Sequence, residues 1–233
     1  MSKLLQMLES GSIWFSRVDQ LIQADPYEGS LPFGLLEDED ERPRTRDAAI
    51  EQKHQMAPGS MSKSRQLFRE TFRQQRSNTF VSCWHSGASD NDAMWRLYGA
   101  EKDGSVCVRS TVAKLAPRLP AWVMLGRVNY VSYDEPWLEE ANAYIPFFRK
   151  RTCFEHEREV RLLFNKTLDD IPNGPGQTAT GFAVAFDPEQ TISTIYISPT
   201  APAWFEQVVQ SSVRRLGMKI EVAPAPMARK PVF

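Results

Sequence analysis

The chain has 233 residues, of which 42% are hydrophobic and 24% are charged, and its formal net charge is −1. This composition is ordinary for a globular protein, and the length fits one large domain or two small ones. A net charge near zero excludes a strong overall field that would attract nucleic acid or an acidic membrane surface, so such binding would need a local patch.

The three cysteines, Cys83, Cys107 and Cys153, are an odd number, lie far apart and form no C-x-x-C pair. This spacing argues against a disulfide framework and against a cysteine-based zinc site. The N-terminus has no signal-peptide pattern, and no apolar run approaches the length of a membrane span. We therefore expect a cytoplasmic protein that is not inserted in a membrane.

Hydrophobic periodicity and turn residues predict strands and helices without regular β-α-β alternation. The predicted helices are residues 3–9, 61–76, 135–150 and 203–216, together with a short helix that holds Met94, Trp95 and Tyr98 and another that follows Ser110 or Thr111. The predicted strands are residues 13–15, 79–84, 104–109, 122–131, 158–164, 181–186, 191–198 and 219–222. Several strands follow one another directly, which favours an α+β class with a mixed, largely antiparallel sheet and peripheral helices.

Three segments outside this pattern set the predicted boundaries. Asp25-Pro26-Tyr27-Glu28-Gly29 predicts a turn, because proline fixes φ, aspartate bonds the following backbone and glycine allows positive φ. Five consecutive acids, residues 37–41, lie in a segment, 33–60, that we expect to be a flexible acidic loop. We expect one α+β domain over residues 1–222, followed by a proline-rich tail over 223–233.

The predicted helix 61–76 carries four arginines on one stripe. Arg65, Arg69, Arg73 and Arg76 fall at positions i, i+4, i+8 and i+11. The simpler interpretation is a solvated helix face. The alternative is a ridge that binds the phosphates of a polynucleotide substrate, with Arg65, Arg69 and Arg73 as contacts.

The segment from Phe154 to Phe164 concentrates charge around the predicted strand 158–164. Because side chains alternate along a strand, Glu157, Glu159 and Arg161 would share one face. Burying two carboxylates and a guanidinium together is costly, so this face is a candidate site. The alternative is a structural ladder of cross-strand ion pairs.

The chain lacks the common catalytic fingerprints. There is no G-x-G-x-x-G motif, phosphate-binding loop, H-E-x-x-H pair or G-x-S-x-G elbow, and we assign no metal ligands. A metal-dependent nuclease remains an alternative if Asp25 and Glu28 lie beside Glu157 and Glu159, because four carboxylates suit Mg²⁺. This alternative requires the Asp25–Gly29 turn to contact the strand of Glu159.

A non-enzymatic alternative rests on the tryptophans. Trp84, Trp95 and Trp137 would then form an apolar surface in a sensor or partner-binding module. Core packing is the more usual role of tryptophan in a domain of this size.

Several segments together resemble a bacterial family known as domain-of-unknown-function family 2971. The resemblance covers nearly the whole chain and rests on the following segments: Leu8 to Ser16 with the Asp25–Gly29 turn; Val81 to Trp84, Asn91 to Gly99 and Gly104 to Val108; Lys150, Phe154, Glu157, Glu159 and Arg161; and Ile197 to Pro231. The order of these segments is also similar to that of ADP-ribosyltransferase-like domains, which bind NAD between two sheets.

This resemblance implies an enzyme that uses NAD to modify a nucleic acid or a protein, as a bacterial toxin or anti-phage defence effector, with a neutralising antitoxin as a further expected partner. Glu159 or Glu157 would be the catalytic carboxylate. Cofactor contacts would come from a hydroxyl, aromatic side chains and phosphate-binding arginines, at Ser82, Trp84, Trp95, Tyr98, Arg109 and Arg161. Members often carry a strand with a basic residue before the first helix, and Arg17 is the nearest substitute for that residue here.

Two neighbouring acids suit the chemistry that this resemblance implies. Cleavage of the nicotinamide–ribose bond develops positive charge on the sugar, and a fixed carboxylate stabilises that charge. One of the two glutamates would hold the ribose and the other would meet the acceptor.

Overall fold

The computed structural model describes residues 1–31, 41–88, 90–99, 104–134, 142–168, 171, 178, 180–229 and 231. It confirms the predicted α+β class with a mostly antiparallel sheet. This sheet has five strands in the order β4-β7-β2-β1-β8, which are Met124–Arg127, Glu159–Asn165, Thr79–His85, Ser12–Arg17 and Gly181–Ala185. Among the described residues, no helix is long and apolar enough to cross a membrane.

The chain forms two compact units. The first comprises Met1–Phe15, His85–Leu125 and Asn173–Phe233, and the second comprises Ser16–Trp84 and Gly126–Pro172. The expectation of a single domain over residues 1–222 stays a prediction.

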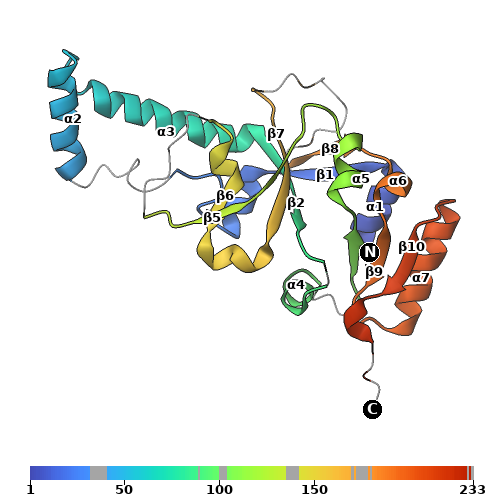
Figure 1. Ribbon diagram of the computed structural model, residues 1–233. Helices are drawn as coiled ribbons and strands as arrows, with labels where there is room; N and C mark the ends of the chain where they lie inside the picture. The colour runs from blue at the N-terminus through green and yellow to red at the C-terminus, as the bar shows by residue number, and fades with distance from the viewer. Residues whose placement is uncertain are drawn as a thin grey trace. The chain divides into compact units, whose positions relative to one another are not determined.

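The first unit contains a three-stranded sheet covered by a helix. Strand β9 (Thr194–Ile197) pairs antiparallel with β3 (Val106–Arg109) and parallel with β10 (Glu221–Pro224). Helix α7 (Ala203–Arg215) lies along β10 (Figure 1) and buries Phe205, Val209 and Val213, which recur every four residues on one helix face. Its remaining helices are α1 (Ser2–Ser10), α4 (Asp92–Tyr98), α5 (Val112–Leu115), α6 (Pro188–Thr191) and the 3₁₀ turns η3 (Ala116–Arg118) and η6 (Pro226–Ala228).

The second unit places strand β7 against β2 over an aromatic core. Phe80 and Phe164 stack with ring centroids 5.1 Å apart, and Phe147, Leu162 and Leu163 are also fully buried. The short parallel strands β5 (Asn129–Val131) and β6 (Arg149–Arg151) pair beside them, with Tyr130 opposite Lys150. The 3₁₀ turns of this unit are η1 (Val18–Gln23), η4 (Ile145–Phe148) and η5 (Thr152–Glu157).

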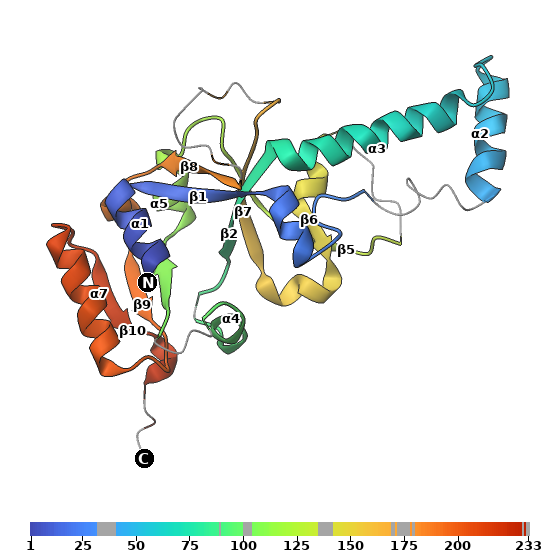
Figure 2. The ribbon, with the colours of Figure 1, turned by 180° about the vertical axis from the view of Figure 1, so that it is seen from behind.

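Helices α2 (Glu41–Lys53) and α3 (Ser60–Asn78) form a hairpin in the second unit, and α3 continues directly into β2 (Figure 2). Glu51 of α2 accepts hydrogen bonds from the N–H groups of Gly59 (3.0 Å) and Met61 (2.8 Å), and so caps the start of α3. The prediction of a loop over 33–60 is therefore wrong for residues 41–53, and residues 33–40 lie outside the described part. The predicted helix 61–76 is confirmed.

Two other predicted elements differ from the structure. Within the predicted helix 135–150, the described residues form η4 and then β6, because Pro146 cannot continue an α-helix and Arg149–Arg151 pair with β5 instead. The predicted strand 122–131 is divided at Val128, whose N–H donates to the Glu159 carbonyl at 2.9 Å. Both differences bring β5 and β6 close to Glu159.

Candidate functional site

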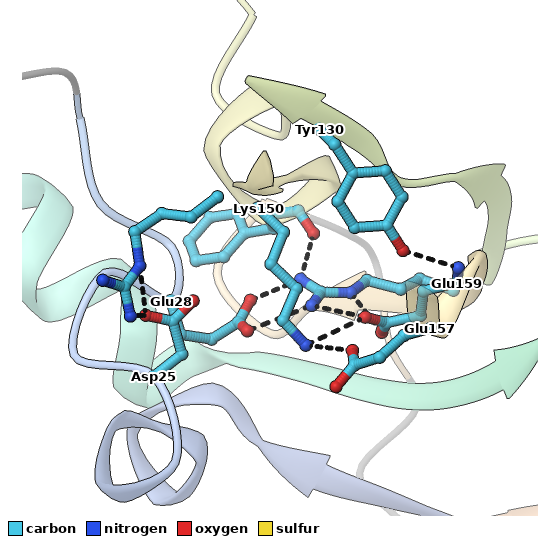
Figure 3. A network of polar contacts seen from close by, with 9 residues as sticks. Asp25, Glu28, Tyr130, Lys150, Glu157 and Glu159 are labelled. Carbon is cyan, nitrogen blue, oxygen red and sulfur yellow. Dashed lines mark hydrogen bonds and ion pairs between the residues drawn. The ribbon is translucent and has the colours of Figure 1, made fainter. Parts of the chain in front are cut away.

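A buried network of charged side chains lies within the second unit (Figure 3). It joins the Asp25–Gly29 turn to strand β6, turn η5 and strand β7, and its carboxylates are Asp25, Glu28, Glu157 and Glu159. Its cations are Lys150, Arg151 and Arg161. The turn thus lies beside the strand of Glu159, which was the geometric requirement of the nuclease alternative.

Arg161 is the centre of this network and is fully buried. Its guanidinium donates to both carboxylate oxygens of Glu159, at 2.6 and 3.1 Å, and to both oxygens of Glu28, at 2.5 and 3.0 Å. A fifth hydrogen bond, of 2.6 Å, goes to the carbonyl of Phe147. A guanidinium has five N–H groups, so Arg161 keeps no donor for another group. The predicted role of Arg161 in binding a cofactor phosphate is therefore not supported.

Lys150 lies at the other end of the carboxylate pair. Its ammonium group pairs with Glu157 and lies 3.4 Å from Glu159, and it also stands 4.7 Å from the centroid of the Phe154 ring. The side chains of Lys150 and Glu157 are each 10% exposed, whereas that of Arg161 is 0% exposed. Lys150 and Glu157 are therefore slightly more exposed than Arg161, and Arg151, at 34%, is the most exposed member of the network.

The predicted turn at Asp25–Gly29 is confirmed and explains how Glu28 reaches Arg161. The Asp25 carboxylate accepts the N–H of Tyr27 at 3.1 Å, and the Asp25 carbonyl accepts the N–H of Glu28 at 3.0 Å. Gly29 follows with a φ of +64°, which glycine adopts at little cost. The turn holds Asp25 and Glu28 at 2% exposure, inside the protein.

The sequence pattern predicts that Glu157 and Glu159 share one strand face. In the structure, the two residues do not lie on one continuous strand. Glu157 ends the 3₁₀ turn η5, and β7 begins at Glu159. Arg158 between them has a φ of +43°. This left-handed residue breaks the alternation of a strand, and Lys150, on strand β6, bonds the two glutamates instead.

The surrounding charges shift the titration of Glu159. Burial opposes its ionisation, but the charges of Arg161 and Lys150 and hydrogen bonds from Arg161 and Cys83 outweigh burial and lower the pKa of Glu159. Burial also opposes protonation of Lys150, yet Glu159 and Glu157 hold the pKa of Lys150 above its usual value. Both groups therefore stay charged at neutral pH.

Two neutral groups near Glu159, the thiol of Cys83 and the hydroxyl of Tyr130, have raised pKa values, whereas the pKa of Glu159 is lowered. Cys83 keeps an exposed surface, but the protein atoms around its thiol remove hydration and, with the charge of Glu159, raise the pKa of Cys83 well above its ordinary value. Burial and Glu159 likewise raise the pKa of Tyr130, whose hydroxyl oxygen accepts the N–H of Glu159 at 2.8 Å. Both shifts favour the neutral thiol and the neutral phenol.

Ser82 and Trp84 lie on the opposite face of the sheet from Glu159. Thr79 of β2 contacts Asn165 of β7 on one face, whereas Phe80 stacks on Phe164 on the other. By strand alternation, Ser82 and Trp84 follow Phe80, and Glu159 and Arg161 follow Asn165. Cys83, rather than Ser82, is the residue of β2 that contacts Glu159.

Trp95, Tyr98 and Arg109 belong to the first unit and lie outside the network. Trp95 is half-buried on α4 and Tyr98 is 67% exposed there. Arg109 on β3 donates to the hydroxyl of Tyr196 at 3.0 Å. Glu159 belongs to the second unit, so the predicted role of these three residues as cofactor contacts beside it stays a prediction. Trp137 lies outside the described residues.

Arg65 and Arg76 of the arginine stripe on α3 bond to other residues of the second unit. Arg65 forms an ion pair with Asp47 of α2, and Arg76 donates to Ser30 and to the carbonyl of Gly29. Arg69 is half-buried and Arg73 is exposed. Asp25 and Glu28, the other two predicted substrate contacts, are buried in the network. Of the three arginines predicted as substrate contacts, Arg73 is the exposed one, and Arg65 is held by the hairpin.

The carboxylates do not form a metal site in the part of the chain that the structure describes. There, no group of three or more histidine, cysteine, aspartate or glutamate side chains is arranged to hold a metal ion. Asp25 and Glu28 instead bond Arg151 and Arg161.

A scan of the chain against models of known protein families finds no match, and neither do searches of curated proteins and of solved structures. The resemblance to domain-of-unknown-function family 2971 and to ADP-ribosyltransferase-like domains therefore stays a prediction from the motifs.

The sequence did not reveal the roles of Arg151, Cys83 and Tyr130, and gave Lys150 only as part of a resemblance. One signal was available for the cations, because Lys150 and Arg151 are adjacent and lie a few residues before the glutamates. Adjacent cations on a strand point to opposite faces, so a single strand can serve both Glu157 and Asp25.

The pH dependence of stability tests the charge of Glu159. Because folding lowers its pKa, the ionised carboxylate stabilises the fold above about pH 4.3, its unfolded value, and this contribution is lost as the pH falls through the lowered folded value. We expect Glu159→Gln to reduce the free energy of unfolding at pH 7, and the gap to the wild type to narrow at acid pH. Urea denaturation at several pH values measures this gap, and a constant gap would contradict the assignment.

Proposed function

We propose that this protein is an ADP-ribosyltransferase-like enzyme that uses NAD to modify a nucleic acid or a protein, with Glu157 as the carboxylate that contacts the sugar. The observation that carries this proposal is that Glu157, paired with Lys150, is the most exposed of the four carboxylates of the network, at 10% of its side chain. Glu159 acts as a positioning residue, because both of its oxygens bond Arg161 and one also lies near Lys150.

The electrostatics of the network suit this reaction class. In the transfer, the bond between the ribose C1′ and the nicotinamide nitrogen breaks and its electron pair leaves with neutral nicotinamide. An acceptor nucleophile then bonds to C1′ and loses its proton. The leaving group needs no general acid, and the main demand is a fixed negative charge beside a cationic sugar. The shifted groups around Glu159 keep their protonation states near neutral pH, which supports electrostatic stabilisation over proton transfer.

In this proposal, the residues that contact NAD all belong to the network. Glu157 and Lys150 would face the ribose, whereas Ser82 and Trp84 lie on the other face of the sheet and have no part in this proposal. The network also has a structural role, since it ties the Asp25–Gly29 turn and β6 to β7. Any variant must therefore be checked for folding before its activity is interpreted.

The experiment is incubation of the protein with NAD labelled in its adenylate part and with mixed RNA, DNA and protein acceptors. We expect label transfer or nicotinamide release, reduced about 100-fold by Glu157→Gln, as for removal of one electrostatic stabiliser. Glu155→Gln is the matched control, because Glu155 is an exposed glutamate of the same turn η5. Absence of transfer and of nicotinamide release in the wild type, or equal rates in wild type and Glu157→Gln, would overturn the proposal.

A further inference from the structure

Arg151 differs from Arg161 in how its guanidinium is used. Two of its N–H groups, on Nε and Nη2, donate to one oxygen of Asp25, at 3.1 and 2.8 Å. A guanidinium has five N–H donors, so three remain without a partner among the described residues. The side chain is 34% exposed, whereas that of Arg161 is 0% exposed and has all five donors engaged.

The guanidinium of Arg151 is also fixed in orientation. It lies 4.5 Å from the centroid of the Tyr27 ring and 5.4 Å from that of Phe154. Asp25, which is 2% exposed, holds the edge formed by Nε and Nη2. The second edge, formed by Nη1 and Nη2, keeps two parallel N–H groups that have no partner among the described residues.

We infer that Arg151 is an anion-binding residue whose free edge takes a phosphate group in a two-pronged contact. A parallel pair of N–H groups matches two phosphate oxygens, and a guanidinium that is already oriented loses little freedom on binding. The identification of the anion as the diphosphate of a dinucleotide rests on the proposed function. The adjacent Lys150 contacts Glu157, so one strand places a diphosphate contact next to the residues that would face the ribose.

The test is isothermal titration calorimetry of the intact protein with inorganic pyrophosphate, at low and at moderate salt. We expect saturable binding that weakens about tenfold or more in Arg151→Gln, the range for a charge-assisted contact. Arg151→Lys keeps a cation beside Asp25 and so protects the fold, but it removes the fork, and we expect intermediate weakening. Arg127→Gln is the control, because Arg127 is an exposed arginine at the end of β4 in the same unit.

Each outcome bears on this inference independently of NAD turnover. Saturable pyrophosphate binding that depends on Arg151 supports the anion site even when no transfer activity is found, and in that case only the proposed function falls. Absence of saturable binding by the wild type overturns the inference. So does equal affinity of the wild type and Arg151→Lys, or an equal loss in Arg127→Gln.

Discussion

Replacement of Arg161 by methionine is expected to lower the free energy of unfolding by about 3–5 kcal/mol, the usual cost of removing one partner from a buried ion pair. The variant leaves Glu28 at 2% exposure and Glu159 at 5% exposure without their main cation. It also leaves the carbonyl of Phe147 without its bond to Arg161. Because typical domains are stable by only 5–15 kcal/mol, this single change would remove a large share of the total. Urea denaturation followed by circular dichroism measures it.

Two comparisons separate burial from the loss of an arginine as such. Arg96→Met removes the exposed i,i+4 pair with Asp92, whose side chains are 79% and 54% exposed, and is expected to cost no more than about 0.5 kcal/mol. In the second comparison, Glu28→Gln is added to Arg161→Met and removes one uncompensated charge. We expect the double variant to be more stable than the sum of the two single changes predicts. Equal costs for Arg161→Met and Arg96→Met, or additive effects at Glu28, would contradict the network.

Local sequence patterns predicted the elements whose conformation is determined by residues close together in the chain. The periodicity of residues 61–76 predicted α3, and aspartate, proline and glycine in one pentapeptide predicted the turn of Asp25–Gly29. Segment 135–150 failed because its described residues are set by tertiary pairing: Arg149–Arg151 join β5 as a strand. Helix α2 was missed because its charged, apolar-poor sequence carries little amphipathic signal, and it is held by the contacts of Asp47 and Glu51 with α3.

Several residues of the candidate site were predicted from the sequence, but the contacts between them were not. Glu157, Glu159 and Arg161 were singled out because two carboxylates and a guanidinium on one strand face are costly to bury, and they do lie in one network. Their partners come from far along the chain: Glu28 is 133 residues from Arg161. The choice between Ser82 and Cys83 depends on which face of β2 meets the charged face of β7, and alternation along one strand cannot decide this.

Replacement of Gly29 by alanine is expected to destabilise the second unit by about 2–5 kcal/mol, through two separable terms. Its φ of +64° costs an L-residue about 1–2 kcal/mol. An added Cβ would also lie 2.7 Å from a ring carbon of Phe147 and 3.4 Å from Val18. Phe147 is fully buried, so its ring cannot move aside without disturbing the core, and overpacking of this kind costs about 1–3 kcal/mol.

Gly59→Ala is the matched control for the backbone term alone. Gly59 has a similar φ of +81°, but an added Cβ there would meet no atom within 4 Å. We expect Gly59→Ala to cost only the backbone term, so the difference between the two variants measures the contact with Phe147. Phe147→Leu in the Gly29→Ala background should recover part of that difference by vacating ring volume next to the new methyl group. Because the carbonyl of Phe147 accepts a hydrogen bond from Arg161, the same contact couples the turn to the charged network. Equal losses for the two glycine variants would show that the turn does not pack on Phe147, and the path from the turn to Arg161 would then rest on Glu28 alone.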